Sequence, residues 1–306
     1  MKIFISGSNG MVGKNLSIHL AKNHQLLTPS SRELNLFNYQ DVEHYLKEYN
    51  PEFIIHCAGR VGGIQANIRS SAAFLVENFD MGKNLALAAR ESRVKNFLNL
   101  GSSCMYPRDY KNPLKEEYIL AAQLEPTNEG YALAKIAIAR LCQYINSEDP
   151  YFQYKTLIPS NLYGPYDKFD PEVSHMIPAV IRKIHLAKTN NHDQVTIWGD
   201  GKTRREFLFV PDLADFVDFA LENYTNVPQY LNIGLGRDYT ILEYYQIIAN
   251  VIGYEGEFVF DKTKPTGMPQ KLVDNTKIKQ LGWDNITPLE EGIAQTYQHF
   301  LEENYV

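Results

Sequence analysis

Lys2-Ile3-Phe4-Ile5-Ser6-Gly7-Ser8-Asn9-Gly10-Met11-Val12-Gly13 stands at the start of the chain, directly after Met1. The apolar residues up to Ile5 predict a buried strand, and the amphipathic stretch from Met11 to Lys22 predicts a helix. Glycines at positions 7, 10 and 13 predict a tight turn between them. A strand, a glycine turn and a helix in this order are typical of the first unit of a Rossmann fold.

The spacing Gly7-x-x-Gly10-x-x-Gly13 differs from the usual Gly-x-Gly-x-x-Gly. Its physical effect is similar, because missing side chains let a pyrophosphate approach the backbone at the positive end of a helix. A plain tight turn is the alternative. The position directly after a strand favours a dinucleotide site.

Strands and helices alternate over about the first 165 residues. Further buried strands are predicted at 25–28, 53–59, 96–100 and 154–158, with helices at 39–49, 78–92 and 129–146. This alternation predicts an α/β fold with a doubly wound parallel sheet. Beyond residue 165 the pattern loosens, with a helix at 177–188 and a short strand at 195–198. We therefore expect a Rossmann domain over 1–165, with a return strand near 230–234, and a smaller substrate lobe over 166–306 that is interleaved with the end of the sheet.

The segment after the second strand bears on the choice of dinucleotide. Pro29-Ser30-Ser31-Arg32 stands where an NAD-binding protein usually has an acidic residue for the ribose 2′-hydroxyl. Hydroxyls and a guanidinium suit a 2′-phosphate, which favours NADP(H). Arg32 could instead be a surface or capping residue, and Glu33 keeps NAD possible.

Composition excludes several classes of function. The 306 residues carry a net charge of −6 and no dense Lys/Arg run, which argues against nucleic acid and against an anionic membrane. No apolar run approaches the roughly 18 to 20 residues that span a bilayer. The three cysteines are not spaced like a zinc site or a disulfide framework. We expect a cytoplasmic protein with free thiols and no metal.

Ser102 and Cys104 follow the strand at 96–100, and Tyr131 and Lys135 lie on the helix that comes next. Residues i and i+4 share a helix face, so Tyr131 and Lys135 point the same way. An ammonium near a phenol lowers the pKa of the phenol from about 10, which makes a general acid. Tyr-x-x-x-Lys is common by chance, and an exposed helix face is the alternative.

Together with Asn161-Leu162-Tyr163-Gly164-Pro165, these motifs resemble the extended short-chain dehydrogenase/reductases, a group that includes nucleotide-sugar epimerases and dehydratases. Within that group the chain is most similar to the GDP-L-fucose synthases, the GDP-4-keto-6-deoxy-D-mannose epimerase-reductases. The stretches that carry the resemblance span nearly the whole chain: 10–13, 32–36, 61–64, 101–107, 125–129, 174–178, 205–207 and 269–272.

The resemblance implies a reaction in two parts. A ketone at C4 of the sugar acidifies the protons at C3 and C5, and Cys104 as base and His175 as acid would invert these centres. Hydride from NADPH would then reduce C4, with Tyr131 as proton donor, Ser102 bonded to the same oxygen, and Lys135 on the nicotinamide ribose. Cys104 could instead be a buried filler, and His175 could merely cap a helix.

The resemblance also implies binding residues. For the cofactor they are Gly7, Asn9, Gly10, Met11, Val12, Gly13, Arg32, Ala58, Lys135 and Asn161, and for the GDP-sugar they are Arg182, Trp198, Arg205 and Lys271. Trp198 could equally pack inside the lobe, and Arg204 could be solvated. The chain departs from the family at Ser8-Asn9, where His-Arg is common, at Gly130, where proline is usual, and at Tyr166, where histidine is frequent. The loss of a cation at Ser8-Asn9 weakens the argument for NADP, and the other two changes could reshape the sugar pocket.

The resemblance further implies a homodimer that pairs the helix before Ser102 with the alanine-rich helix after Tyr131. The same small faces could pack within one chain. Two other functions stay open: a C4 reductase of a GDP-4-keto-6-deoxy-heptose that does not epimerise and serves a surface polysaccharide, and a regulatory dinucleotide sensor. Sensors of that kind typically lose the tyrosine or the lysine, and both are present here.

Overall fold

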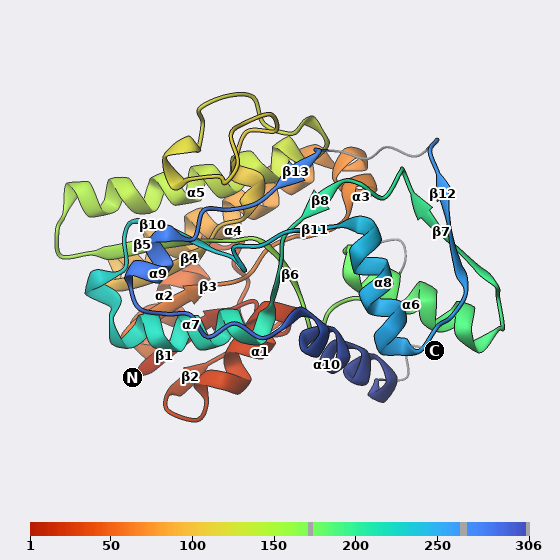
Figure 1. Ribbon diagram of the computed structural model, residues 1–306. Helices are drawn as coiled ribbons and strands as arrows, with labels where there is room; N and C mark the ends of the chain where they lie inside the picture. Colours follow the sequence, from red (N-terminus) through yellow and green to blue (C-terminus); the bar gives the residue numbers. More distant parts are fainter. Residues whose placement is uncertain (171–173, 264–267, 304–306) are drawn as a thin grey trace.

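The computed structural model describes residues 1–170, 174–263 and 268–303 (Figure 1). The strands are β1 (Lys2–Ser6), β2 (Gln25–Leu27), β3 (Phe53–His56), β4 (Asn96–Leu100), β5 (Gln153–Pro159), β6 (Asn161–Tyr163), β7 (Gln194–Trp198), β8 (Arg204–Arg205), β9 (Phe207–Phe209), β10 (Tyr230–Ile233), β11 (Tyr239–Thr240), β12 (Glu257–Asp261) and β13 (Gln270–Lys271). The α-helices are α1 (Met11–Leu20), α2 (Tyr39–Tyr49), α3 (Ile64–Arg69), α4 (Ser71–Glu91), α5 (Glu129–Glu148), α6 (Met176–Thr189), α7 (Val210–Glu222), α8 (Ile241–Ile252), α9 (Thr276–Gln280) and α10 (Leu289–Glu302). Short 3-10 turns lie at Ser103–Met105, Glu116–Tyr118, Pro126–Asn128 and Tyr224–Asn226.

Six parallel strands form the central sheet in the order β10-β5-β4-β3-β1-β2. This confirms the predicted α/β fold with a doubly wound parallel sheet. The chain passes from β1 to β2 at one edge and then returns to β3 on the other side of β1. Ligands of such sheets bind at the carboxyl ends of the strands where the order reverses, here between β1 and β3.

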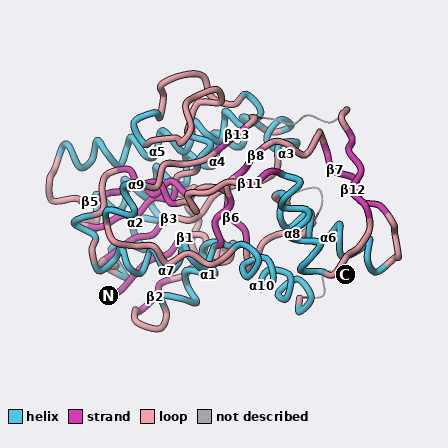
Figure 2. The backbone as a smooth tube through the Cα atoms, in the orientation of Figure 1, coloured by secondary structure: helices cyan, strands magenta, loops and turns pink. Residues whose placement is uncertain are grey.

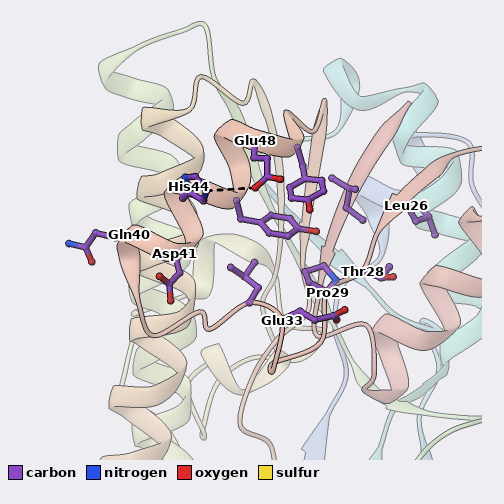
Figure 3. A pocket seen from close by; sticks show the side chains of 12 residues that line it. Leu26, Thr28, Pro29, Glu33, Gln40, Asp41, His44 and Glu48 are labelled. Carbon is purple, nitrogen blue, oxygen red and sulfur yellow. Dashed lines mark ion pairs between the residues drawn. The ribbon is translucent and has the colours of Figure 1, made fainter.

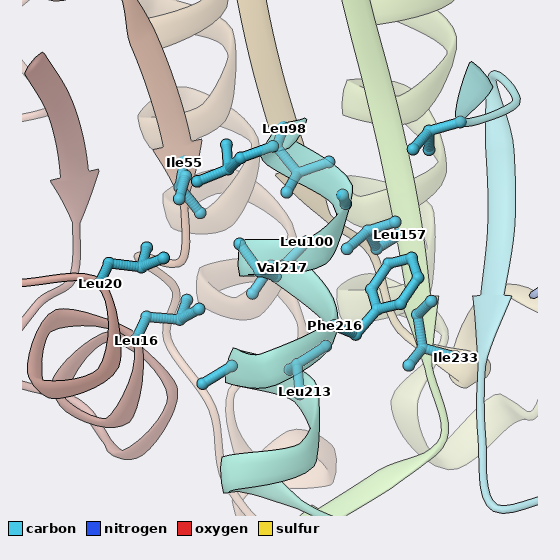
Figure 4. Packing of buried hydrophobic residues seen from close by; sticks show 14 of the residues in the cluster. Leu16, Leu20, Ile55, Leu98, Leu100, Leu157, Leu213, Phe216, Val217 and Ile233 are labelled. Carbon is cyan, nitrogen blue, oxygen red and sulfur yellow. The ribbon is translucent and has the colours of Figure 1, made fainter. Parts of the chain in front are cut away.

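Helices cover both faces of this sheet (Figure 2). On one face α1 and α7 pack against the apolar side chains of the strands, and Leu16, Leu213 and Phe216 are buried among them (Figure 4). On the other face lie α2, α4 and α5, with Leu46, Leu85 and Ile138 in a second cluster. Strands buried on both faces read as continuous apolar runs, which explains why they could be predicted from sequence.

The remaining elements form a smaller group beside the sheet (Figure 1). Helices α6, α8 and α10 share an apolar cluster that includes Ile181, Ile248 and Phe300, and the two-stranded sheet of β7 and β12 packs on it. The strands β8, β11 and β13 form a three-stranded sheet that lies between the central sheet and these helices. Its strand β8 is followed after one residue by β9, which pairs with β6.

One helical prediction needs correction. The helix expected at 78–92 begins at Ser71, because residues 71–77 contain Ala72, Ala73 and Leu75, which favour helix. The short helix α3 lies directly before this helix.

The alanines of α5 pack inside the chain. Ala132, Ala134 and Ala139 are buried, and α5 packs closely against α4. At Gly82 of α4 a Cβ atom would come within 2.3 Å of the Ile138 side chain. These small residues therefore serve the contact between α4 and α5 of one chain.

Gly130 serves the same helix pair. A Cβ atom at this position would lie 2.5 Å from the carbonyl oxygen of Ser71, the first residue of α4. Such a contact is too short to be tolerated without a backbone shift. Gly130 therefore shapes the contact between the two helix starts.

Candidate active site at the carboxyl ends of the sheet strands

The glycine turn lies between β1 and α1 at the reversal point of the sheet. Gly7 has a φ of +71°, and a Cβ there would lie 2.7 Å from the backbone of Ala58, which follows β3. A Cβ at Gly13 would lie 2.2 Å from the carbonyl oxygen of Gly7. Gly10 caps α1 without a side chain, so the first N–H groups of this helix are not covered by a capping side chain. This cradle fits the pyrophosphate of a dinucleotide.

The other residues expected at the cofactor surround this turn. Asn9 is exposed, while Met11 and Val12 are half-buried in the first turn of α1. Ala58 donates its N–H to the Ser6 hydroxyl at 3.2 Å, which links the ends of β3 and β1. Asn161 lies further away along the chain, at the start of β6, and its amide donates to the carbonyl oxygen of Glu206 at 3.0 Å.

Arg32 is exposed in the loop after β2. Next to it, Glu33 accepts a hydrogen bond from the N–H of Ser30 at 2.7 Å, and this bond lowers the pKa of Glu33. The carboxylate of Glu33 is therefore engaged within the loop that follows β2.

A cavity of about 840 Å³ opens beside this loop, between β2 and α2 (Figure 3). Its lining includes Glu33, Asp41 and Glu48, and Glu48 pairs with His44 at 3.7 Å. Neither the glycine turn nor the residues at the end of β4 line it. Acidic walls do not suit a phosphate, so this cavity does not belong to the candidate active site.

Ser102 and Cys104 lie directly beyond β4, as the sequence predicts for a strand end. Ser102 has extended backbone, and its hydroxyl accepts the N–H of Cys104 at 3.3 Å. Cys104 is buried and belongs to an apolar cluster against which Tyr131 of α5 also packs. The turn after β4 thus brings the hydroxyl and the thiol to the tyrosine.

Tyr131 is half-buried in the first turn of α5, and its phenol lies close to the Ser102 hydroxyl. The nitrogen Nζ of Lys135 lies 5.7 Å from the Tyr131 ring centroid and donates to the carbonyl oxygen of Leu100 at 2.8 Å. Serine, tyrosine and lysine therefore meet at the end of β4.

The predicted lowering of the Tyr131 pKa is wrong in this structure. Burial raises the pKa of Tyr131, and the nearby Cys104 adds to this, while the Ser102 hydroxyl opposes it. Lys135 is itself buried, and burial lowers the pKa of its ammonium. Tyr131 is consequently protonated at neutral pH, which is the state a proton donor needs.

The pKa of the Cys104 thiol is raised as well. Burial raises the pKa of its thiol, while Lys271, a bond with Ser102 and Lys135 pull that pKa down. Burial lowers the pKa of Lys271 to about 8. Desolvation outweighs these cations, so the thiol form dominates at neutral pH.

His175 is the N-cap residue of α6, but its side chain makes no capping hydrogen bond. The residue keeps an exposed surface. The protein packed around the imidazole partly desolvates it and, together with the charge of Lys168, lowers its pKa. The preceding Ser174 lies beside Gly63, in the loop that leads to α3. This loop connects His175 to the Tyr131 region, because Gly62 packs on Phe74, whose ring meets that of Tyr131 edge-on at 6.4 Å.

The candidate substrate residues fall into two groups. Lys271 of β13 lies opposite Arg205 of β8 in the register of the small sheet, and the Arg205 guanidinium donates to the carbonyl oxygens of Arg204 and Met268. Arg182 lies on α6, where it donates to the Phe169 carbonyl oxygen at 3.2 Å, while its buried Nε has no hydrogen-bond partner among the residues that the structure describes.

Trp198, at the carboxyl end of β7, is 60% exposed, so it does not pack inside the lobe. Arg204 is not simply solvated. It forms an ion pair with Asp238 at 2.8 Å.

Two acidic residues near these cations were not predicted from the sequence. Burial lowers the pKa of both Arg205 and Lys271, and the carboxylate of Glu125, which accepts a hydrogen bond from the hydroxyl of Thr127, opposes this shift. Glu206 is fully buried next to Arg205. Both lie in stretches that carry the family resemblance, 125–129 and 205–207, but the sequence does not show that these side chains lie near the cations.

Tyr166 lies away from this cluster. Its ring has Lys14 of α1 at 4.0 Å on one side and meets His299 of α10 edge-on at 4.4 Å. The described residues contain no group of three or more His, Cys, Asp or Glu side chains that could hold a metal ion. Nor does any helix in the described ranges have the length and apolar character to cross a membrane.

Known proteins resemble this chain over nearly its whole length. Residues 3–234 match the NAD dependent epimerase/dehydratase family. A GDP-L-colitose synthase of Yersinia pseudotuberculosis is 56% identical over 99% of both chains. A GDP-L-fucose synthase of Azorhizobium caulinodans is 46% identical over 100% of this chain and 98% of the relative.

A solved structure resembles the whole fold. It is a GDP-mannoheptose C4 reductase from Campylobacter jejuni with NADP bound, which is 34% identical over 98% of both chains with a TM-score of 0.88. The matches cover at least 98% of each of these three proteins. The chain is therefore a member of the NAD dependent epimerase/dehydratase family, in the extended short-chain dehydrogenase/reductases, and within it of the GDP-L-fucose synthase group.

Proposed function

We propose that this protein reduces C4 of a GDP-4-keto-6-deoxy-sugar with NADPH and inverts the sugar at C5, and at C3 where C3 carries a hydroxyl. The observation that supports it best is the meeting of Ser102, Cys104 and Tyr131 at the end of β4, with Lys135 and Lys271 close to the thiol. Hydroxyl, phenol and ammonium suit the reduction. The thiol beside cations suits the proton transfers.

In the reductive part, the dinucleotide supplies a hydride to C4. Tyr131 would donate a proton to the oxygen at C4, and its raised pKa keeps that proton in place at neutral pH. Ser102 would donate a second hydrogen bond to this oxygen. Lys135 would hold the nicotinamide ribose and, when charged, stabilise negative charge on the phenol.

In the epimerising part, Cys104 would remove a proton next to the ketone, and His175 would return one from the other face. The enolate needs stabilisation at its oxygen, which Tyr131 and Ser102 can provide from the position they hold for reduction. Burial raises the pKa of the thiol and so makes its thiolate a stronger base. Lys271 keeps that thiolate accessible.

The GDP-sugar would extend from the end of β4 toward the lobe. Arg205 and Arg182 suit the diphosphate by their fork geometry, and the unpaired Nε of Arg182 is a donor ready for an oxygen ligand. Lys271 would lie between the sugar and the diphosphate, and exposed Trp198 would stack on the guanine. In this division residues 1–165 hold the dinucleotide, and residues 166–306 supply most of the substrate lobe.

We propose NADP(H) in preference to NAD because Glu33 is bonded to Ser30 and Arg32 is exposed beside it. Arg32→Ala should raise KM for NADPH by about 10- to 100-fold, which corresponds to loss of a charge-assisted contact worth about 1.5 to 3 kcal/mol. KM for NADH should change less than about threefold. Steady-state kinetics with NADPH and with NADH measure both KM values, and Arg69→Ala serves as the control. Equal changes of the two KM values in Arg32→Ala would refute the assignment.

We further propose a homodimer in which the exposed faces of α4 and α5 meet their copies. Val76 of α4 is 54% exposed, and Leu133 and Tyr144 of α5, which share one helix face, are 39% and 58% exposed. A two-fold contact would bury these three side chains on both subunits, because each subunit contributes the same surface. Leu133→Glu should give a monomer by light scattering, whereas Ile18→Glu on α1 should not. A monomeric wild type would contradict the dimer.

The relatives leave a choice of sugar. L-colitose lacks the C3 hydroxyl of L-fucose, so only C5 can be inverted in a colitose synthase, and a heptose C4 reductase represents the alternative without epimerisation. Oxidation of NADPH should be measured with a GDP-4-keto-6-deoxy-hexose, its 3-deoxy counterpart and a GDP-4-keto-6-deoxy-heptose. Turnover of a hexose supports the proposal, and turnover of the heptose alone would replace it by the heptose reductase.

A further inference from the structure

Glu206 lies between β8 and β9 and has no exposed surface. Its oxygen Oε1 accepts the N–H of Gly236 at 2.7 Å, and Oε2 accepts the N–H of Val273 at 2.9 Å. In the part of the chain that the structure describes, backbone N–H groups and not a Lys or Arg side chain hold this carboxylate.

These bonds join three segments that are distant in sequence. Residues 234–236 leave the central sheet after β10, and Val273 follows β13 by two residues. Figure 1 shows β8 and β13 side by side between the central sheet and the lobe. The carbonyl oxygen of Glu206 also receives the Asn161 amide, so the residue reaches toward β6 as well.

The neighbours of Glu206 are the cations of the candidate site. Arg205 precedes it directly, and Lys271 lies two residues before the Val273 N–H that its carboxylate binds. The register of the small sheet places Arg205 opposite Lys271. A single buried carboxylate thus fixes the strand of one cation and the strand of the other.

The surroundings provide room for the carboxylate. A Cβ atom at Gly234 would lie 2.4 Å from Oε1 of Glu206, so glycine is required where the two segments approach. Burial raises the pKa of Glu206 to about 7, and the backbone N–H bonds oppose this. A buried carboxylate costs stability unless its hydrogen bonds are satisfied, and here both oxygens are used.

We propose that Glu206 is a positioning residue for GDP-sugar binding, which sets Arg205 and Lys271 at the distance that the substrate requires. This rests on the proposed function, since it assigns the two cations to the GDP-sugar. Glu206 itself touches neither substrate nor cofactor. It acts through the backbone of residues 234–236 and 273.

The test compares Glu206→Gln with Asp212→Asn. Asp212 is a matched control because its buried carboxylate also holds a backbone N–H and a hydroxyl, both of Thr287, away from the site. In Glu206→Gln an amide N–H₂ faces a backbone N–H donor, because an amide has only one acceptor oxygen. Gly234→Ala is a second variant, which displaces the carboxylate without removing it.

Calorimetric titration with GDP and with NADPH should separate a positioning role from a structural one. Glu206→Gln and Gly234→Ala should weaken GDP binding by about 10- to 100-fold and change NADPH binding by less than about threefold. Asp212→Asn should leave both affinities unchanged even if it lowers Tm. GDP affinity equal to that of the wild type in folded Glu206→Gln would overturn the inference.

Hydrogen exchange provides a readout that does not depend on the ligand. Peptides covering 234–236 and 270–274 should exchange faster in Glu206→Gln than in the wild type, whereas unchanged exchange would overturn the inference. Failure of the wild type to bind GDP would instead contradict the proposed function.

Discussion

Tyr131→Phe should lower kcat for reduction at C4 by about 10²- to 10⁴-fold, the usual contribution of a positioned general acid. The change removes one oxygen and leaves the ring, which meets Phe74 edge-on, in place. NADPH affinity should therefore stay within about threefold. Stopped-flow measurement of NADPH oxidation in single turnover measures the chemical step directly.

Tyr49→Phe is the control for this prediction, because Tyr49 lies at the end of α2, is 38% exposed and is remote from the candidate active site. Its kcat should equal that of the wild type. Since burial raises the pKa of Tyr131, the rate of reduction should not fall across neutral pH through loss of the phenolic proton. An unchanged kcat in Tyr131→Phe would assign the proton donor elsewhere.

Cys104→Ser should lower the rate of proton exchange next to the ketone by about 10²- to 10⁴-fold, because a hydroxyl is a far weaker acid than a thiol and forms little of the basic anion. Incubation of the keto sugar in D₂O without dinucleotide, followed by NMR, measures this exchange. Tyr131→Phe should retain more exchange than Cys104→Ser. The two variants together separate epimerisation from reduction.

The pH dependence of exchange follows from the groups around Cys104. Burial raises the thiol pKa, so the thiolate fraction, and with it the rate of exchange, should rise as pH increases through neutrality. Lys271, with a pKa of about 8, loses its supporting charge above that pH, so the rise should flatten there. Cys142→Ser serves as the control, because Cys142 is also a buried thiol and lies on α5. This variant should exchange the protons of the keto sugar at the wild-type rate. If Cys104→Ser exchanged the protons of the keto sugar as fast as the wild type, the Cys104 thiol would have only a packing role.

Much of the fold could be predicted because its local signals agree with its tertiary structure. The apolar runs that became β1, β3 and β4 are buried on both faces, and the glycines between β1 and α1 stand where a Cβ has no room. The start of α4 was misplaced because its first turns are partly exposed and show no clear apolar period. Gly130 could not be interpreted without knowing that α4 begins against it.

The site was predictable in its residue types but not in its electrostatics. The spacing of Tyr131 and Lys135 shows that they share a helix face, yet it does not show that Lys135 bonds Leu100 or that burial dominates the pKa of Tyr131 and Cys104. Desolvation depends on all surrounding atoms, which come from distant segments. Glu206 was missed for the same reason, since its partners are residues 30 to 67 positions away.

The most direct test is NMR of the products formed with NADPH in D₂O from GDP-4-keto-6-deoxy-D-mannose and from its 3-deoxy counterpart. We predict that at least one of them yields a C4-reduced GDP-6-deoxy-L-sugar with deuterium at C5. A reduced product that keeps the D configuration and carries no deuterium at C5, or no reduction of either keto sugar, would contradict the proposed function.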